Sequence, residues 1–323
     1  MHPTRRAALA LPLLAAPGLA LAQERFPSRP IRLVVGFPPG GGSDLVARPI
    51  AQRMGELLGQ PVAVENRGGA NGNLGLDAVA KAPADGYVFG HVNNAVIGVN
   101  PLLYRNLPFD PVRELEALAA VTIGGLFLMV PAALPANTLA EFVALARAQP
   151  GRLNFASAGP GSITHLAFEL FRRQAGVELE VVHYRGSAPA LQDMLGGRAQ
   201  LMIDGINLAK AQVDSGRVKA LAFLNAERHP LMPQVPTARE QGLERLVIPG
   251  WQGFVVRAGT PAPVAEALER AVRAALEDPG VQETFRNQAI LTRFAGRAEF
   301  ARMIREETER WRPIVTEMGL TLD

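Results

Sequence analysis

IRLVVGFPPGGGSD, residues 31–44, joins a run of β-branched residues to three consecutive glycines and the start of a helical pattern. The pattern predicts a strand over residues 31–36 and a helix over residues 43–58. Glycines let the backbone approach a ligand closely, and a helix start offers unpaired N–H groups that favour an anion. The same residues also fit a plain turn in which Ser43 or Asp44 only caps the helix.

Strand and helix patterns alternate along the chain on both sides of this segment. Further strands are predicted over residues 61–65, 87–92, 121–130, 154–156, 181–184, 199–204 and 218–224. Further helices are predicted over residues 74–81, 138–148, 162–175, 188–195, 206–215, 263–276, from 279 onward and 296–317. The order predicts an α/β protein of two lobes, each with a mostly parallel sheet flanked by helices, and a ligand cleft between them. We expect the last helices to return and cover the first sheet.

The N-terminus predicts export. Arg5 and Arg6 precede an apolar run over residues 7–21, and Ala20-Leu21-Ala22 has the small-x-small pattern of a signal peptidase site. These parts predict a secretory signal peptide over residues 1–22 and a periplasmic protein. The apolar run is too short for a membrane anchor. The arginine pair leaves both the general secretory and the twin-arginine routes open.

Composition excludes several classes of function. The chain has no cysteine, which excludes disulfides, thiol catalysis and cysteine-ligated metals. Its 33 basic and 30 acidic residues form no basic block, so we expect no nucleic-acid partner. The glycine-rich loops match neither nucleotide-binding fingerprint, and the histidines lack the spacing of metal ligands. We therefore expect no cofactor and no metal.

Two later strand-to-helix loops repeat the composition of the first. The second contains Ser157, Gly159, Gly161 and Ser162, with His165 in the following turn, and the third contains Gly186, Ser187 and Ala188. In open α/β sheets, ligands bind beyond the carboxyl ends of the strands, so we expect the three loops to face one cleft. The other candidates for this cleft are Phe37, Asn93 and Asp204.

Ser162, His165 and Asp204 also supply the residue types of a hydrolytic triad. Ser162 does not lie in a G-x-S-x-G turn, however, and Ser162 and His165 are three residues apart at one helix start. A helix cap explains the serine more simply. We therefore expect no enzyme and keep hydrolysis as a remote alternative.

A series of motifs runs in order along the chain: FPSRPI from Phe26, VGFPPGG from Val35, VENRGGA from Val64, NPLLY from Asn100, FDP from Phe109, HYRG from His183 and VPT from Val235. Through them the chain resembles the substrate-binding proteins of tripartite tricarboxylate transporters, also called Bug receptors. The resemblance implies a Venus-flytrap fold with lobe 1 formed by residues 23–124 and 226–323 and lobe 2 by residues 125–225.

The resemblance also implies that backbone amides and ordered waters of the first two loops hold a ligand carboxylate. Together with the candidates above, the expected binding residues are Phe37, Pro39, Gly40, Gly41, Ser43, Asp44, Asn93, Ser157, Gly159, Gly161, Ser162, His165, Gly186, Ser187, Ala188 and Asp204. Pro160 departs from the family pattern, since proline removes one N–H donor.

The expected function is capture of a small carboxylate, namely a di- or tricarboxylate, an acidic amino acid or an aromatic acid. The expected partners are the membrane subunits of a tripartite transporter, or alternatively a sensor protein that reads the loaded receptor. We expect the receptor to be a monomer.

Overall fold

The computed structural model describes residues 26–322, so the predicted signal peptide lies outside the described residues. The strands are β1 (Ile31–Val35), β2 (Val62–Asn66), β3 (Val88–Asn93), β4 (Leu115–Pro131), β5 (Asn154–Ser157), β6 (Glu180–His183), β7 (Leu201–Gly205), β8 (Val218–Phe223), β9 (Pro249–Arg257) and β10 (Leu291–Gly296). The helices are α1 (Gly42–Leu58), α2 (Asn73–Ala80), α3 (Asn100–Leu103), α4 (Pro111–Glu114), α5 (Leu139–Ala148), α6 (Ile163–Ala175), α7 (Ser187–Leu195), α8 (Ile206–Asp214), α9 (Ala262–Glu277), α10 (Pro279–Asn287) and α11 (Arg297–Met318). A 3₁₀-helix, η1 (Ala70–Gly72), and a π-helix, η2 (Asn94–Val99), complete the described elements.

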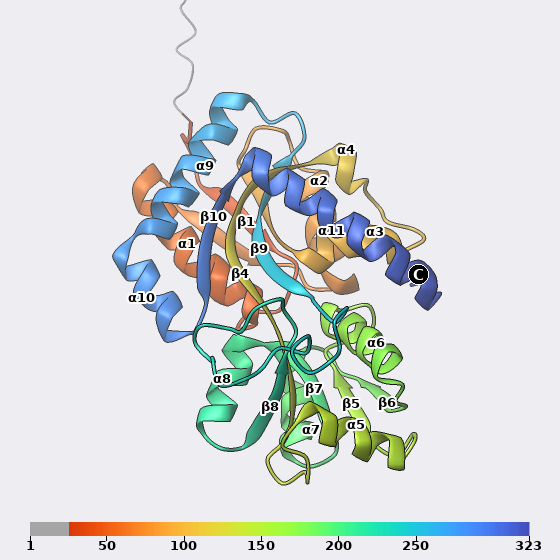
Figure 1. The fold of residues 1–323 in the computed structure, drawn as a ribbon. Coiled ribbons are helices and arrows are strands. Elements are labelled where there is room, and N and C mark those ends of the chain that lie inside the picture. The colour runs from red at the N-terminus through yellow and green to blue at the C-terminus, as the bar shows by residue number, and fades with distance from the viewer. Residues whose placement is uncertain (1–25, 323) are drawn as a thin grey trace, which may run out of the picture.

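The long strand β4 connects two lobes, which lie above and below its midpoint in Figure 1. Between Leu115 and Gly125 it pairs with β9, and β10 pairs with its other edge. From Leu126 onward it pairs with β7 and β8 instead. The expected two-lobed α/β fold is thus present, with β4 as a physical link between the lobes.

The sheet is mixed, which corrects the expectation of mostly parallel sheets. Strands β2, β1 and β3 are parallel in lobe 1, and β6, β5 and β7 are parallel in lobe 2. Every pair that involves β4 or β9 is antiparallel. Only the strands of the βαβ units are parallel to one another. Strands β4 and β9 run antiparallel to their neighbours.

Strand register brings the predicted loops to common edges. Val35 at the end of β1 pairs with Asn66 of β2 and His91 of β3, so the first loop and Asn93 leave lobe 1 on the same side. In lobe 2, Ser157 pairs with His183, so the second and third loops leave together.

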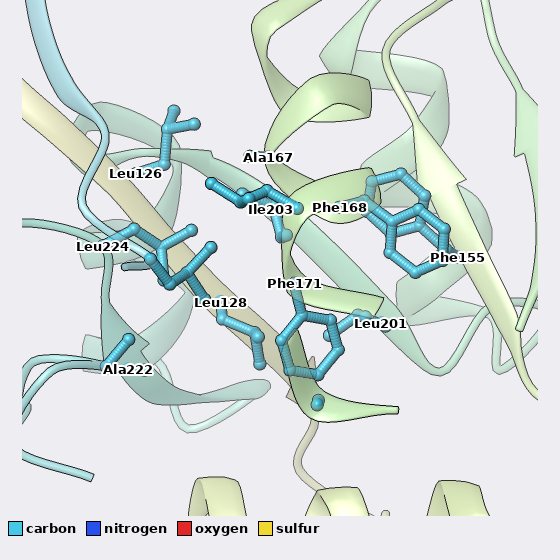
Figure 2. Packing of buried hydrophobic residues seen from close by; sticks show 14 of the residues in the cluster. Leu126, Leu128, Phe155, Ala167, Phe168, Phe171, Leu201, Ile203, Ala222 and Leu224 are labelled. Atoms are coloured by element: carbon cyan, nitrogen blue, oxygen red, sulfur yellow. The ribbon is translucent and has the colours of Figure 1, made fainter. Parts of the chain in front are cut away.

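Each lobe has apolar cores on both faces of its sheet. In lobe 1, one cluster lies under α1, α9 and α10, and another lies under α2 and α11. In lobe 2, the larger cluster packs α5 and α6 against the sheet, and Figure 2 shows Phe168 of α6 beside Phe155 of β5. Their rings stack with centroids 4.1 Å apart.

The C-terminal helix α11 contacts both lobes. Phe300 near its start belongs to a lobe 1 cluster, as expected for a helix that returns to the first sheet. Trp311 and Val315 near its end belong to the large lobe 2 cluster. Met232 and Ile248 also pack into lobe 2 cores. We therefore propose that the chain returns to lobe 1 at β9 rather than at residue 226.

Candidate ligand-binding site

The first loop is shaped by Asp44, which folds back on it. The Oδ2 atom of Asp44 accepts from the Gly40 N–H at 2.9 Å and from Arg48 Nε at 2.7 Å, and its Oδ1 accepts from Asn66 Nδ2 at 3.0 Å. Burial opposes the charge, but the Arg48, Gly40 and Asn66 donors hold the pKa of Asp44 below its ordinary value. The Asp44 carboxylate and the Gly40 N–H are therefore occupied by hydrogen bonds that stabilise the loop itself.

The start of α1 carries three consecutive free amides. Gly41 is the N-cap, and no side chain caps the helix. The alternative in which Ser43 or Asp44 caps α1 is therefore wrong. Within residues 26–322, the N–H groups of Gly41, Gly42 and Ser43 and the Ser43 hydroxyl have no hydrogen-bond partner. Donors of this kind at a helix N-terminus suit a carboxylate.

Phe37 and Pro39 differ in burial. Phe37 is half-buried and packs against both lobe 1 clusters, and its carbonyl accepts from Asn66 Nδ2 at 2.9 Å. Pro39 is exposed. Gly40 has a φ of +80°, a conformation that favours glycine, so another residue there would strain the loop.

The second loop uses most of its donors internally. The Gly161 N–H donates to His165 Nδ1 at 3.1 Å, and the Gly159 N–H donates to Ser157 Oγ at 3.2 Å. Ser162 is the N-cap of α6, and its Oγ accepts from the His165 N–H at 3.3 Å. The structure brings the five predicted residues together, but these contacts hold the loop itself.

Of the two histidines beside this loop, His165 is buried and His183 is exposed at the end of β6. The His165 and His183 rings meet edge to face with centroids 4.8 Å apart, and His183 Nδ1 lies 3.0 Å from Ser157 Oγ. Burial, together with the charges of His183 and Arg172, lowers the pKa of His165 to about 4. A neutral His165 is consistent with its Nδ1 accepting a hydrogen bond from the Gly161 N–H.

The described contacts do not assemble a triad. The Ser162 hydroxyl bonds the His165 backbone rather than its ring, and it also lies 2.8 Å from the Gly159 carbonyl. Among residues 26–322, no hydrogen bond joins Asp204 to either residue. The arrangement supports the capping interpretation of Ser162.

The third loop and Asp204 lie together. Gly186, with a φ of +114°, is the N-cap of α7, and the N–H groups of Ser187 and Ala188 have no partner within the described chain. Asp204 Oδ1 accepts from the Gly205 N–H at 2.8 Å, whereas its Oδ2 is buried without a partner. Burial raises the pKa of Asp204, and the Ser187 side chain and the Gly205 N–H oppose this shift.

The start of α8 is a component of the site that the sequence analysis missed. A Cβ placed on Gly42 would lie 3.5 Å from Asn207 Nδ2, so the starts of α1 and α8 face each other across the lobes. The Asn207 side chain has no hydrogen-bond partner within residues 26–322. Gly205 before α8 offered the signal, because it repeats the strand, glycine and helix order of the first loop.

Two asparagines of lobe 1, Asn93 and Asn71, lie next to the elements described above. Asn93 caps η2, since its Oδ1 accepts from the Val96 N–H at 3.0 Å, and its Nδ2 has no partner in the described chain. Asn71, also missed from the sequence, has a left-handed backbone with φ 50° and ψ 40°. Its Nδ2 donates to the Gly161 carbonyl of lobe 2 at 3.0 Å.

We propose that these groups form one site, which we call the interlobe site: Gly41, Gly42, Ser43, Asn93, Ser187, Ala188, Asp204 and Asn207. Within the described residues, no cluster of three acidic or histidine side chains has the geometry to hold a metal ion. Over the same range, each helix is too short or too polar to cross a membrane.

Two α/β lobes with opposed helix starts define the class of the periplasmic binding proteins, and solved members share the fold. The sequence profile of the tripartite tricarboxylate transporter family receptors matches residues 46–320, and the chain belongs to this family. The predicted resemblance is confirmed. Members of the family are receptors rather than enzymes.

Individual relatives agree over nearly the whole chain. Protein BugT of Bordetella pertussis is 34% identical, and the alignment covers 100% of each chain. A Rhodopseudomonas palustris protein solved with adipate is 32% identical with a TM-score of 0.86, covering 92% of this chain and 99% of the other. MatC from the same species, solved with bound malate, is 33% identical with a TM-score of 0.83, covering 90% of this chain and 100% of the other.

Proposed function

We propose that this protein captures a small organic carboxylate in the periplasm and presents it to the membrane subunits of a tripartite transporter. The observation that carries the proposal is the row of three unpartnered amides at Gly41, Gly42 and Ser43. A carboxylate there gains charge-assisted hydrogen bonds and the favourable end of the α1 dipole. The relatives solved with adipate and malate support the same class of ligand.

The site supports binding without side-chain cations. Arg48 contacts the first loop, and its guanidinium is paired with Asp44. Neutralisation of a ligand carboxylate then falls to backbone N–H groups, as at other helix N-termini. Backbone N–H donors can bind many different carboxylates. They therefore select for the carboxylate group, and other residues contact the rest of the ligand.

Export and partnership complete the proposal. We propose that residues 1–22 direct the chain to the periplasm and are then removed, and that the mature receptor works as a monomer. We further propose that Ser162 has a structural role, so that the receptor returns its ligand chemically unchanged.

Titration of the refolded, ligand-free mature chain tests the function. Calorimetry with malate, adipate, citrate, aspartate and benzoate is expected to give saturable binding for at least one of them. If none binds and none raises the melting temperature, the proposed function is wrong.

A graded pair of substitutions locates the carboxylate. Gly41 is exposed and has an ordinary φ, and a Cβ there meets only the Pro38 carbonyl oxygen at 3.6 Å. The fold therefore accepts a side chain that blocks approach to the amides. We expect Gly41→Ala to weaken binding slightly and Gly41→Val to weaken it by at least about tenfold, or 1.4 kcal/mol, with little change in melting temperature.

The control for this pair is Gly280→Ala at the start of α10, which also has an ordinary φ. It is expected to leave affinity unchanged. Unchanged affinity in Gly41→Val would place the carboxylate elsewhere.

A further inference from the structure

Asp204 carries an unused hydrogen-bond acceptor at the interlobe site. Its Oδ1 is bonded to the Gly205 N–H, but its Oδ2 is buried and has no partner. Buried polar atoms in native proteins are almost always paired, and an unpaired one raises the question of what occupies the position in function. A carboxylate oxygen accepts and does not donate when ionised, so the missing partner is a donor.

The protein itself does not supply this donor. No lysine, arginine or histidine within residues 26–322 forms an ion pair with Asp204. The Ser187 side chain lies nearby and favours the charged form, yet Oδ2 stays without a hydrogen bond. A ligand in the interlobe site could supply a donor at this position beside the Ser187 hydroxyl.

The two sides of the interlobe site differ in the chemistry that they offer. The start of α1 presents the free N–H donors of Gly41, Gly42 and Ser43. The β7 end of lobe 2 presents Asp204, followed by Asn207, whose amide lies opposite Gly42. A ligand carboxylate set directly against Asp204 would meet an acceptor of like charge, which is unfavourable. The free Ser187 and Ala188 N–H groups are donors, so the preference for a donor group of the ligand applies at Asp204 itself.

We propose that Asp204 accepts a hydrogen bond from a hydroxyl or ammonium group of the ligand, so that the receptor selects small carboxylates that carry such a donor over plain carboxylates of the same length. This proposal rests on the proposed function and adds how the receptor recognises the part of the ligand beyond its carboxylate. Asn207, which offers both a donor and an acceptor, lies between the two positions and accommodates the connecting part of the ligand.

Matched ligands test the proposal on the mature wild-type chain. The series are succinate, malate and aspartate; glutarate, 2-hydroxyglutarate and glutamate; adipate and 2-aminoadipate; benzoate and 4-hydroxybenzoate. In the series that binds, we expect the donor-bearing member to bind at least tenfold more tightly than the plain member. A preference for the amino acid identifies ammonium as the donor, and a preference for the hydroxy acid identifies hydroxyl.

Two substitutions then assign the preference to Asp204. Asp204→Ala is expected to abolish it while leaving the affinity for the plain carboxylate within about twofold. Asp204→Asn keeps an acceptor oxygen but loses the charge, so it is expected to retain part of a hydroxyl preference and to lose an ammonium preference. Asp214→Asn, on the exposed end of α8, is the control and is expected to change neither.

The outcomes separate the two proposals. If carboxylates bind but plain and donor-bearing members bind equally, or if the preference survives in Asp204→Ala, the role of Asp204 is wrong and carboxylate capture stands. If no carboxylate binds at all, the proposed function fails and the donor assignment fails with it. Melting curves of each variant show that a lost preference does not arise from a lost fold.

Discussion

Asp204 holds one carboxylate oxygen against the Gly205 N–H and the other in a buried position without a partner. This second oxygen is shielded from solvent, which disfavours its charged form. Burial accordingly raises the pKa of Asp204 above its ordinary value of 3.8. The residue that we assign to ligand selection is therefore one that the empty protein holds at a cost in stability.

This cost depends on pH in a defined direction. Because the pKa of Asp204 is higher in the folded than in the unfolded chain, the folded state binds more protons between the two values. The contribution of Asp204 to stability then falls as pH rises through that window and stays unfavourable above it. Below the unfolded value of 3.8, both states are protonated and the penalty is absent.

We predict that Asp204→Asn raises the melting temperature of the ligand-free protein at pH 7 by about 1–4 °C. The gain is expected to shrink toward zero as the pH is lowered through the ordinary range of a carboxyl group. Calorimetric melts of both proteins across that pH range check it. A variant that melts lower than wild type at pH 7 would show that Asp204 is stabilised by a partner within the protein.

At the scale of elements, η2 and α11 are joined through one buried carboxylate. Glu307 of α11 is 2% exposed, and its Oε1 accepts from Trp311 Nε1 at 2.9 Å and from Asn94 Nδ2 at 3.1 Å. Burial raises the pKa of Glu307, while Trp311, Arg310 and Asn94 oppose that shift. This contact anchors the π-helix that follows Asn93 of the interlobe site.

We predict that Glu307→Ala lowers the free energy of unfolding by about 2–4 kcal/mol, because it leaves the buried Trp311 Nε1–H unpaired, takes one acceptor from Asn94 Nδ2 and removes packed volume. Glu307→Gln, which keeps an acceptor oxygen, is expected to lose less. The control is Glu306→Ala, since Glu306 is 61% exposed and lies 3.5 Å from Arg302; it is expected to change stability by about 0.5 kcal/mol at most. Denaturant melts that show equal losses for Glu306 and Glu307 would contradict this assignment.

Sequence patterns predicted many of these elements within one or two residues. A helix was predicted over residues 138–148, and α5 begins one residue later, with the Thr138 side chain accepting from the Glu141 N–H at 3.1 Å as its N-cap. Strands β9 and β10 were missed. In β9, Gly253 fits because a Cβ there would lie 2.4 Å from the Ala119 carbonyl, and such a packing requirement is invisible in local periodicity.

At the scale of the whole molecule, Asn71 connects the lobes directly. Its Nδ2 donates both to the Gly161 carbonyl of lobe 2 and to Asn100 Oδ1 of lobe 1, at 3.0 and 2.8 Å. Its left-handed backbone is an unfavourable conformation for most residues and is held by this network. A hydrogen bond that forms only when the lobes are close favours the closed population, and so favours ligand binding.

We predict that Asn71→Gly weakens ligand binding by about 2- to 12-fold, the equivalent of one net hydrogen bond of roughly 0.5–1.5 kcal/mol. Glycine tolerates the left-handed backbone, so the melting temperature is expected to fall only through the lost hydrogen bonds, including the one to Asn100. Asn71→Ala removes the same contacts but keeps the backbone strain, so it is expected to lower the melting temperature further. Equal ligand affinity in wild type and Asn71→Gly would show that the contact does not contribute to closure.

The sequence alone determined the alternation of strands and helices, the glycine loops at helix starts and the family resemblance, because these depend on local backbone preferences and on motifs read in order. It did not determine which amides stay free. The second loop resembles the first in composition, but its donors are taken up by Ser157 and His165.

Only the tertiary structure decided that the start of α8 faces the start of α1, and that Asp204 Oδ2 is buried without a partner. The reason is physical: hydrogen-bond satisfaction and burial depend on groups that are distant along the chain and are brought together when the long strand β4 connects the lobes. A local pattern can place a donor at a helix end, but it cannot show what lies opposite that donor.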